Sequence, residues 1–181
     1  MKRVLFFLSI FFCICTQAFA MTYANEPKDY NGLNWGSSIS DFNKSGRQFA
    51  FKSSLANQNV DIYTPVDQSQ NIFNKKFDEI TYHFYKSQFF MVRAIKYNDN
   101  QMSQTLLQTI SSQHGRPTQQ NDNIHQKTTT YHWQGNTTTI VLFQDFMRKE
   151  TTLTFYNHRL HLDWSMLSKK TQQPAKIKER S

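Results

Sequence analysis

The chain has 181 residues, of which 15% are aromatic, and a formal net charge of +8 at neutral pH. The surplus positive charge lies at the two ends, because residues 21–168 hold 14 basic and 12 acidic side chains. This near-neutral central part argues against nucleic-acid binding, which needs clustered cations, and the aromatic content argues against a disordered chain.

Residues 1–20 have the pattern of a secretory signal peptide. Lys2 and Arg3 are followed by an apolar run from Val4 to Cys15, and residues 18–20 read Ala-Phe-Ala, a typical A-x-A cleavage site. A retained membrane anchor is the alternative, but a membrane-spanning helix needs about 20 apolar residues and this run is shorter. We therefore predict cleavage at about Ala20 and an exported chain, periplasmic or secreted, that is soluble after cleavage.

Both cysteines, Cys13 and Cys15, lie inside that signal. Each follows a bulky apolar residue, whereas a lipoprotein signal has small residues before the modified cysteine. The mature chain would then contain no thiol, which excludes disulfides, thiolate nucleophiles and cysteine metal ligands. Its remaining length of about 160 residues is enough for one hydrophobic core without such cross-links.

The first half of the mature chain predicts a leader, a short helix and four strands. Residues 21–32 are polar and are predicted to form a loose leader. Ser38 and Asp41 make a capping-box pair that starts a short helix, which Gly46 ends. Alternating apolar residues predict strands, the last two of which form an antiparallel hairpin, at residues 49–51, 60–63, 77–85 and 89–97.

The second half predicts one secure helix and a run of strands. Apolar residues recur on one face of residues 101–114, and Gly115 then stops this amphipathic helix. Residues 118–126 are predicted to be a polar loop. Strands are predicted at residues 127–133, 137–145 and 151–157, and residues 159–164 form either a fourth strand or the start of a short terminal helix.

These elements predict a single α+β domain at residues 33–168, with an antiparallel β-sheet of about five to seven strands packed against two helices. Helices and strands are segregated along the chain, which favours an antiparallel sheet covered on one face. Residues 169–181 are basic and almost without large apolar side chains, which predicts a disordered tail. That tail would be solvated, or at most make a weak contact with an anionic membrane surface.

No residue set in the sequence carries a catalytic signature. The chain lacks a G-x-S-x-G elbow, an H-E-x-x-H motif and a phosphate-binding glycine loop, so we predict no enzyme activity, no catalytic residue and no cofactor. His161 and Asp163 would share one face of a strand and could supply two metal ligands. A third ligand would have to come from His132 or His158, and because no spacing specifies either, no metal site is predicted.

Two features could mark a binding surface. Threonines cluster on the three strands predicted after residue 126, where they suit a solvated sheet face and could also form a flat carbohydrate-binding surface. Phe89 and Phe90 are adjacent, so on a strand one ring must face away from the core unless both sheet faces are covered. An exposed aromatic ring there would mark a possible partner surface.

Three motifs follow one another in a familiar order: LNWGSS at residues 33–38, the helix stop HGRP at residues 114–117 and the Trp-bearing strand YHW at residues 131–133. Over about residues 32–157 this order resembles a loose group of small exported bacterial proteins of unknown function, with a W-G-x-S opening. By element type only, the chain is also similar to the small lipoprotein of the outer-membrane barrel-assembly machinery. It departs from that lipoprotein by its greater length and by lacking a lipidated cysteine. The shared motifs are structural, so the resemblance implies no active site.

The sequence therefore predicts a non-enzymatic exported interaction domain, which engages a protein partner in the cell envelope or outside the cell through a sheet face or edge. The alternative is a module that binds a small ligand or a glycan in an aromatic-lined cleft. A hydrolase acting on the envelope is a distant alternative. An enclosed aromatic pocket would favour ligand binding, and an exposed apolar patch would favour a partner.

Overall fold

The structure is a computed structural model that describes residues 23–66, 71–99 and 101–172. The predicted signal peptide at residues 1–20 lies outside the described residues, and so do residues 173–181 of the tail predicted at residues 169–181. Residues 169–172, also predicted as disordered tail, are helical.

The central element is a sheet of eight strands in the order β3-β4-β7-β8-β12-β11-β10-β9, with every neighbouring pair antiparallel. Its strands are β3 (Phe49–Leu55), β4 (Val60–Pro65), β7 (Glu79–Tyr85), β8 (Gln88–Tyr97), β9 (Gln119–Asn123), β10 (Thr128–Gln134), β11 (Thr138–Asp145) and β12 (Glu150–Asn157). Two small hairpins accompany it: β1 (Asp29–Tyr30) with β2 (Leu33–Asn34), and β5 (Asn71–Ile72) with β6 (Lys75–Lys76). The predicted α+β class with an antiparallel sheet is confirmed at this level, although the strands outnumber those predicted.

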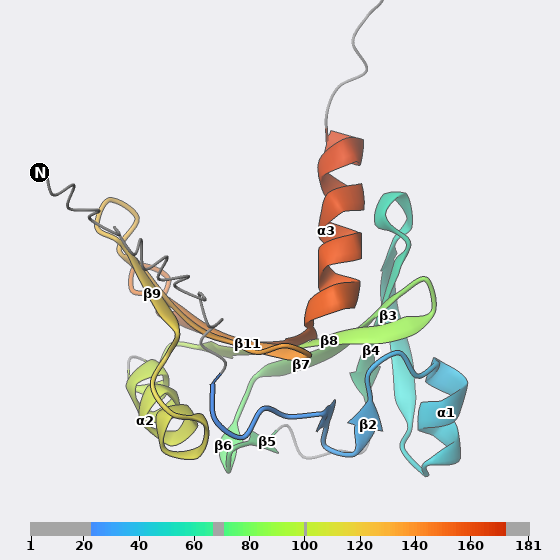
Figure 1. The fold of residues 1–181 in the computed structure, drawn as a ribbon, viewed down its shortest axis with the longest axis horizontal. Helices are drawn as coiled ribbons and strands as arrows, with labels where there is room; N and C mark the ends of the chain where they lie inside the picture. Colours follow the sequence, from blue (N-terminus) through green and yellow to red (C-terminus); the bar gives the residue numbers. More distant parts are fainter. Residues whose placement is uncertain (1–22, 67–70, 100, 173–181) are drawn as a thin grey trace, which may run out of the picture.

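In the part of the chain that the structure describes, three α-helices flank the sheet: α1 (Ile39–Lys44), α2 (Met102–His114) and α3 (His158–Gln172). In Figure 1, α1 and α2 lie on one side of the sheet, and α3 stands on the other side. The capping box predicted at Ser38 and Asp41 is present at the start of α1. Among the described residues, no helix combines the length and the apolar character needed to cross a membrane.

Two stretches differ from their predicted structure. Residues 119–123, predicted as loop, form the edge strand β9, whose side chains are all polar and exposed and therefore give no apolar alternation. Residues 159–164 belong to the helix α3, which is 15 residues long. The side-chain oxygen of Asn157 accepts the N–H of Leu160 at 3.0 Å, an N-capping contact that turns the chain from β12 into this helix.

The main core lies between the sheet and the layer that contains α1 and α2. Phe42 of α1 and both Leu106 and Ile110 of α2 are fully buried there, against the apolar faces of the central strands. Trp133 of β10 is also fully buried, and its Nε1 donates to the Gly115 carbonyl oxygen at 2.8 Å. This bond holds the end of α2 against the sheet.

The leader at residues 21–32 is not loose where the structure describes it. Tyr23 and Tyr30 are buried in the main core, because each ring removes a large apolar area from water. The Tyr23 hydroxyl donates to the Thr138 carbonyl oxygen at 3.0 Å. The Glu26 carboxylate accepts three backbone N–H groups at residues 136–138. The leader is therefore a strap across the core, and the folded domain begins before residue 33.

A smaller second core lies beneath α3, on the opposite side of the sheet. Val60, Tyr85 and Phe90 from three neighbouring strands are buried there together with Leu160 of α3. Trp164 packs over Phe90 with ring centroids 5.7 Å apart. The sheet is therefore covered on both faces, but α3 covers only part of the second face.

Candidate functional site

The strands beyond α3 leave one side of the sheet only partly covered, since Thr139 and Thr152 on that side are buried whereas Val141 and Phe143 are not. Along β12, Leu153 and Phe155 face the main core, so the alternation of side chains directs Thr152, Thr154 and Tyr156 to the other side. The same alternation applies to β10 and β11. We call this surface the open face and define it by three residues from each strand: Thr128, Thr130, His132, Thr139, Val141, Phe143, Thr152, Thr154 and Tyr156.

The open face carries apolar side chains in its centre. Thr130, Phe143 and Thr152 form one row across the three strands, because they are successive cross-strand partners. His132, Val141 and Thr154 form the next row. Phe143 and Val141 are only half-buried, since no element of the described structure packs over them as α3 packs over Phe90.

The helix α3 forms a wall at one end of the open face. His161 stacks on the ring of Tyr156, with centroids 3.9 Å apart and planes at 23°. Trp164 contacts His161 with centroids 5.1 Å apart, and its Nε1 donates to Gln58 Oε1 at 3.0 Å. These contacts fix the rotation of α3 about its axis, so that His161 borders the open face.

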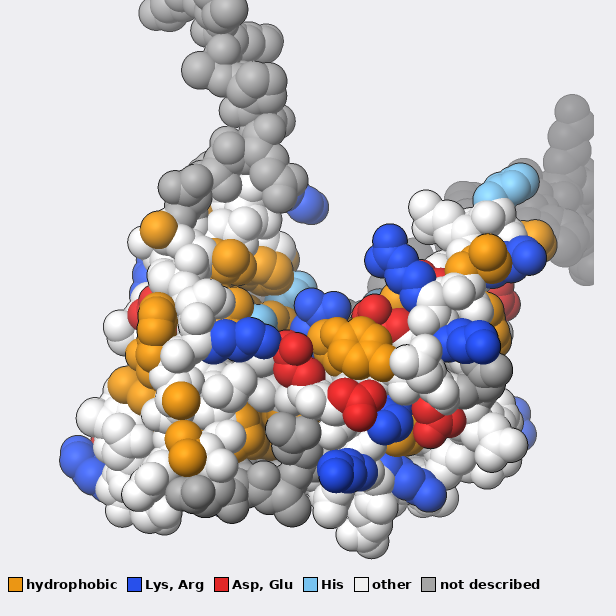
Figure 2. Space-filling view, turned by 180° about the vertical axis from the view of Figure 1, so that it is seen from behind, with side chains coloured by type: hydrophobic (Ala, Val, Ile, Leu, Met, Phe, Trp, Pro, Cys, Tyr) orange, Lys and Arg blue, Asp and Glu red, His pale blue; other side chains and the backbone are white. Residues whose placement is uncertain are grey.

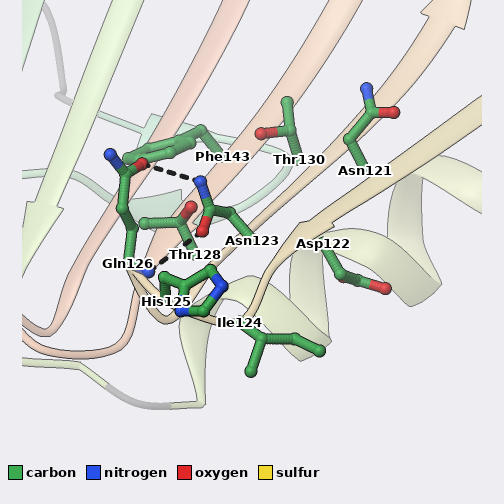
Figure 3. Close-up of a pocket in the computed structure, with 9 residues that line it drawn as sticks. All are labelled: Asn121, Asp122, Asn123, Ile124, His125, Gln126, Thr128, Thr130 and Phe143. Carbon is green, nitrogen blue, oxygen red and sulfur yellow. Dashed lines mark hydrogen bonds between the residues drawn. The ribbon is translucent and has the colours of Figure 1, made fainter.

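The β9–β10 hairpin forms the opposite wall. A shallow depression of about 610 Å³ lies there, lined by β9, the turn that follows it, Thr128, Thr130 and Phe143 (Figure 3). Asn123 and Gln126 brace this turn, since the Gln126 N–H donates to Asn123 Oδ1 at 3.0 Å and Asn123 Nδ2 donates to Gln126 Oε1 at 3.1 Å. The wall is polar, and its amides and hydroxyls can both donate and accept hydrogen bonds.

The space between the two walls is a broad hollow. Figure 2 shows it between α3 and the far hairpins, with hydrophobic, acidic and basic side chains gathered on its floor. The strands from β12 to β9 span about 14 Å at the usual spacing of about 4.8 Å. Arg93 of β8 lies 4.0 Å from the Glu150 carboxylate on this side of the sheet, and the pair adds charge of both signs.

Burial keeps the titratable groups of the open face uncharged near neutral pH. It lowers the pKa of His161 to about 4, with a smaller contribution from the nearby His158, and it also lowers the pKa of His132. Burial raises the pKa of Tyr156. The face therefore offers neutral rings, hydroxyls and amides, which suit binding through apolar contact and hydrogen bonds.

The histidines considered as metal ligands are not brought together. His161 and Asp163 lie on a helix rather than a strand, where residues two apart point to different sides. His132 lies on β10, whereas His158 and His161 lie on α3. Within the described part of the chain, no three side chains of the ligand types converge on a possible metal position.

Phe89 and Phe90 do not form a surface. Both rings are fully buried, because a β-bulge between β7 and β8 and the coverage of both sheet faces give each ring its own core. Phe89 stacks on Trp35 in the main core, with centroids 4.8 Å apart, and Phe90 lies beneath Trp164. The suggestion of a partner surface at these two residues is therefore wrong.

A second hollow, of about 390 Å³, lies on the side of the main core. The rings of Tyr30 and Phe155 border it with centroids 5.2 Å apart, and Phe73 lies 6.0 Å from Phe155. His114 also lines it, and its Nδ1 lies 3.0 Å from the Asn25 carbonyl oxygen. This hollow has the aromatic lining that a small cyclic ligand requires.

Sequence reasoning missed Phe143 and Tyr156 as surface residues, because aromatic residues on strands are usually buried. The alternation of side chains along a strand could have found them: Tyr156 is two residues from Thr154 and Phe143 is four residues from Thr139, so each shares a face with a threonine. No family model, curated protein or solved structure matches this chain. A function for the open face is therefore inferred from its own side chains alone.

Proposed function

We propose that this chain is a non-enzymatic, exported interaction domain that binds a protein partner on the open face. The observation that carries the proposal is the half-buried pair Val141 and Phe143 on a floor between two walls. Antiparallel sheets commonly leave one face in water, but such a face is then mostly polar. Here the apolar Val141 and Phe143 lie on the central strand β11, with hydroxyl-bearing and charged side chains around them, as apolar residues do within a protein interface.

The dimensions of the hollow favour a single secondary-structure element as the bound segment. An α-helix with its side chains is about 10–12 Å across, which fits the width of about 14 Å from β12 to β9. Phe143 would be the central anchor, because aromatic residues surrounded by polar contacts supply much of the free energy of protein association. The Thr130 and Thr154 side chains beside it would exclude water, and their hydroxyls would satisfy polar groups of the partner.

Site-specific photo-cross-linking tests this proposal. A photoreactive amino acid replaces Val141 in one version of the exported chain, and Lys44, exposed on α1 at the opposite side of the sheet, in the control. We expect position 141 to give a discrete adduct with one protein of the envelope or medium, and position 44 to give none. Equal adducts at both positions, or no adduct at position 141, would contradict the proposal.

A substitution on the same floor gives a second test. Phe143→Ser removes the anchor from a half-buried position while leaving the main core untouched. We expect capture of the cross-linked partner by the purified variant to fall at least about tenfold, since a lost anchor costs on the order of 1–2 kcal/mol or more. An unchanged unfolding midpoint in urea shows that the fold is intact.

A second function is favoured by the aromatic hollow beside Phe73. Phe73 and Asn74 have φ of +52° and +58°, as a two-residue turn between β5 and β6 requires, and this turn holds the Phe73 ring beside Phe155 although large side chains rarely adopt such a φ. The hollow would hold a small cyclic ligand or a sugar against Tyr30 and Phe155. Native mass spectrometry of the protein purified from its own cells tests this: a retained small molecule that is lost in Phe73→Ala supports it, and a ligand-free native protein contradicts it.

A further inference from the structure

Two neighbouring hairpin turns carry large apolar side chains into solvent. Ile124, in the turn between β9 and β10, is 86% exposed. Phe146 and Met147, in the turn between β11 and β12, are 52% and 67% exposed. Turns are normally occupied by small and polar residues, so three such side chains on two turns are unusual. We call these three residues the apolar tip.

The two turns form one surface. The Phe146 N–H donates to the Lys127 carbonyl oxygen at 3.1 Å, which ties the second turn to the first. Ile124, Lys127 and Phe146 also line one shallow hollow of about 280 Å³. The hairpins project at the end of the sheet remote from α3 (Figure 1), and Figure 2 shows hydrophobic and basic side chains together on the projecting lobe.

The accessible charge around the apolar tip is positive. Lys127, Arg148 and Lys149 are exposed, and the side chain of Arg148 is 79% accessible. Two neighbouring acids are turned inward, since the side chains of Asp145 and Glu150 are only 15% and 19% accessible, whereas Asp122, which lines the same hollow, is exposed. The accessible charge around the tip is therefore net positive, with three exposed cations against one exposed carboxylate.

Side-chain oxygens in the two turns already accept backbone N–H groups of the tip, which would otherwise resist leaving water. Asp145 Oδ1 accepts the N–H groups of Met147 and Arg148, each at 2.9 Å. In the other turn, Asn123 Oδ1 accepts the Gln126 N–H at 3.0 Å. Backbone groups that have internal partners cost far less to bring toward hydrocarbon than free ones do.

We propose that the apolar tip inserts into the surface of a phospholipid bilayer that contains anionic headgroups. Ile124, Phe146 and Met147 would enter the boundary between headgroups and acyl chains, while the three cations contact lipid phosphates. This combination favours a bilayer over a protein surface, because a bilayer supplies hydrocarbon and dense negative charge to any protruding tip without shape complementarity. The apolar tip adjoins the β9–β10 wall of the open face, and the proposal does not depend on the protein partner.

A single label at the tip reports insertion directly. Because both cysteines lie at positions 13 and 15, the chain from residue 21 onward contains no thiol, and Met147→Cys provides a unique attachment site for a polarity-sensitive fluorophore. The matched control is Met166→Cys on α3, where the native side chain is 50% exposed. With vesicles of phosphatidylcholine and phosphatidylglycerol, we expect a blue shift at position 147 and none at position 166. A shift at both positions or at neither would overturn the proposal.

Vesicle co-sedimentation separates the tip from the basic residues 173–181. We expect the triple variant Ile124→Ser, Phe146→Ser and Met147→Ser to bind these vesicles at least about tenfold more weakly. Removing residues 173–181, or changing Leu162 and Met166 on α3 to Ser, should change binding by less than about twofold. Equal binding of the triple variant would overturn the proposal. So would binding to soluble polyphosphate as strong as binding to vesicles, because that result would show a purely electrostatic contact.

Discussion

At the scale of single residues, Glu26 has the most consequential contacts. Its carboxylate accepts N–H groups from Asn136 at 3.0 Å, from Thr137, and from Thr138 at 2.6 Å. Bonds to a charged acceptor are stronger than neutral ones, and removing the acceptor leaves donors without a partner. We expect Glu26→Ala to lower the free energy of unfolding by roughly 2–3 kcal/mol, measured by urea denaturation.

We call the three hydrogen bonds accepted by Glu26 the Glu26 clamp. Two further variants check that the loss of stability comes from this clamp. Lys28→Ala, at an exposed position of the same strap, should leave the unfolding midpoint unchanged. Gly135→Ala should disturb the clamp from the other side, because a Cβ there would lie 2.6 Å from the Thr138 carbonyl oxygen. A stable Gly135→Ala variant would show that the turn can move and that the clamp is not rigid.

His83 gives the domain a definite pH dependence. Burial, with smaller effects of Arg93 and Lys52, lowers its pKa to about 4, whereas an unfolded histidine titrates near 6.5. Between these values the unfolded state binds the proton and the folded state does not, so stability is full above pH 6.5 and falls as the pH drops toward 4. We expect a loss of about 3 kcal/mol over this window, measured by urea denaturation at each pH.

The variant His83→Gln isolates this contribution. Glutamine can keep a hydrogen bond to the Thr81 hydroxyl, which lies 2.9 Å from His83 Nε2, but it does not titrate. The acid-induced loss should therefore shrink, and the remainder should come mainly from His161, whose pKa is also lowered to about 4. An unchanged pH profile would contradict the assignment to His83.

At the scale of elements, α3 rests on a smaller core than α2. It is anchored through Leu160, Trp164 and Leu167 in the second core, whereas α2 lies over the main core. We expect Trp164→Ala to increase hydrogen exchange of the α3 amides strongly, because the substitution removes the contact with Phe90 and the bond to Gln58. The α2 amides should keep their protection, and equal loss in both helices would show that α3 is part of one cooperative unit.

The elements differ in how well the sequence predicts them, for physical reasons. The helix α2 is confirmed because its apolar stripe and the stop at Gly115 agree with the way it packs. The strand β9 could not be found, since an edge strand of Gln, Asn and Asp depends on pairing with β10 rather than on its own pattern. The ambiguity at residues 159–164 is resolved by the cap at Asn157, a contact that short apolar periodicity does not reveal.

At the scale of the whole molecule, the strap belongs to the same cooperative unit as the sheet. Tyr23 and Tyr30 fill the main core, and their removal would leave a cavity beside Phe155 and His114. We expect deletion of residues 21–32 from the mature chain to abolish cooperative thermal unfolding, since losing one large buried side chain typically costs about 3–5 kcal/mol. A truncated chain that melts with a sharp transition at a similar temperature would contradict this.

The candidate site is a property of the assembled molecule, which limits what sequence reasoning could find. The threonine clusters mark the solvated face only in part, because Thr128, Thr130 and Thr154 are half-buried whereas Thr139 and Thr152 on the same side are buried. The walls are not visible, since they come from the placement of α3 beside β12 and of β9 at the sheet edge. Whether Phe90 is exposed likewise depends on α3, an element more than 60 residues later in the chain.

The clamp at Glu26 also sets the order in which the domain can fold. Its partners lie more than 100 residues further along the chain, so the strap has nothing to bind until residues 136–138 have formed their turn. Contacts of such high sequence separation slow folding, and the strap cannot take its final position before the C-terminal half of the chain is present. The predicted signal implies that the chain crosses a membrane starting from its N-terminus. The strap would then remain unbound until residues 136–138 have emerged, and the hydrogen bonds of Glu26 would form late in folding.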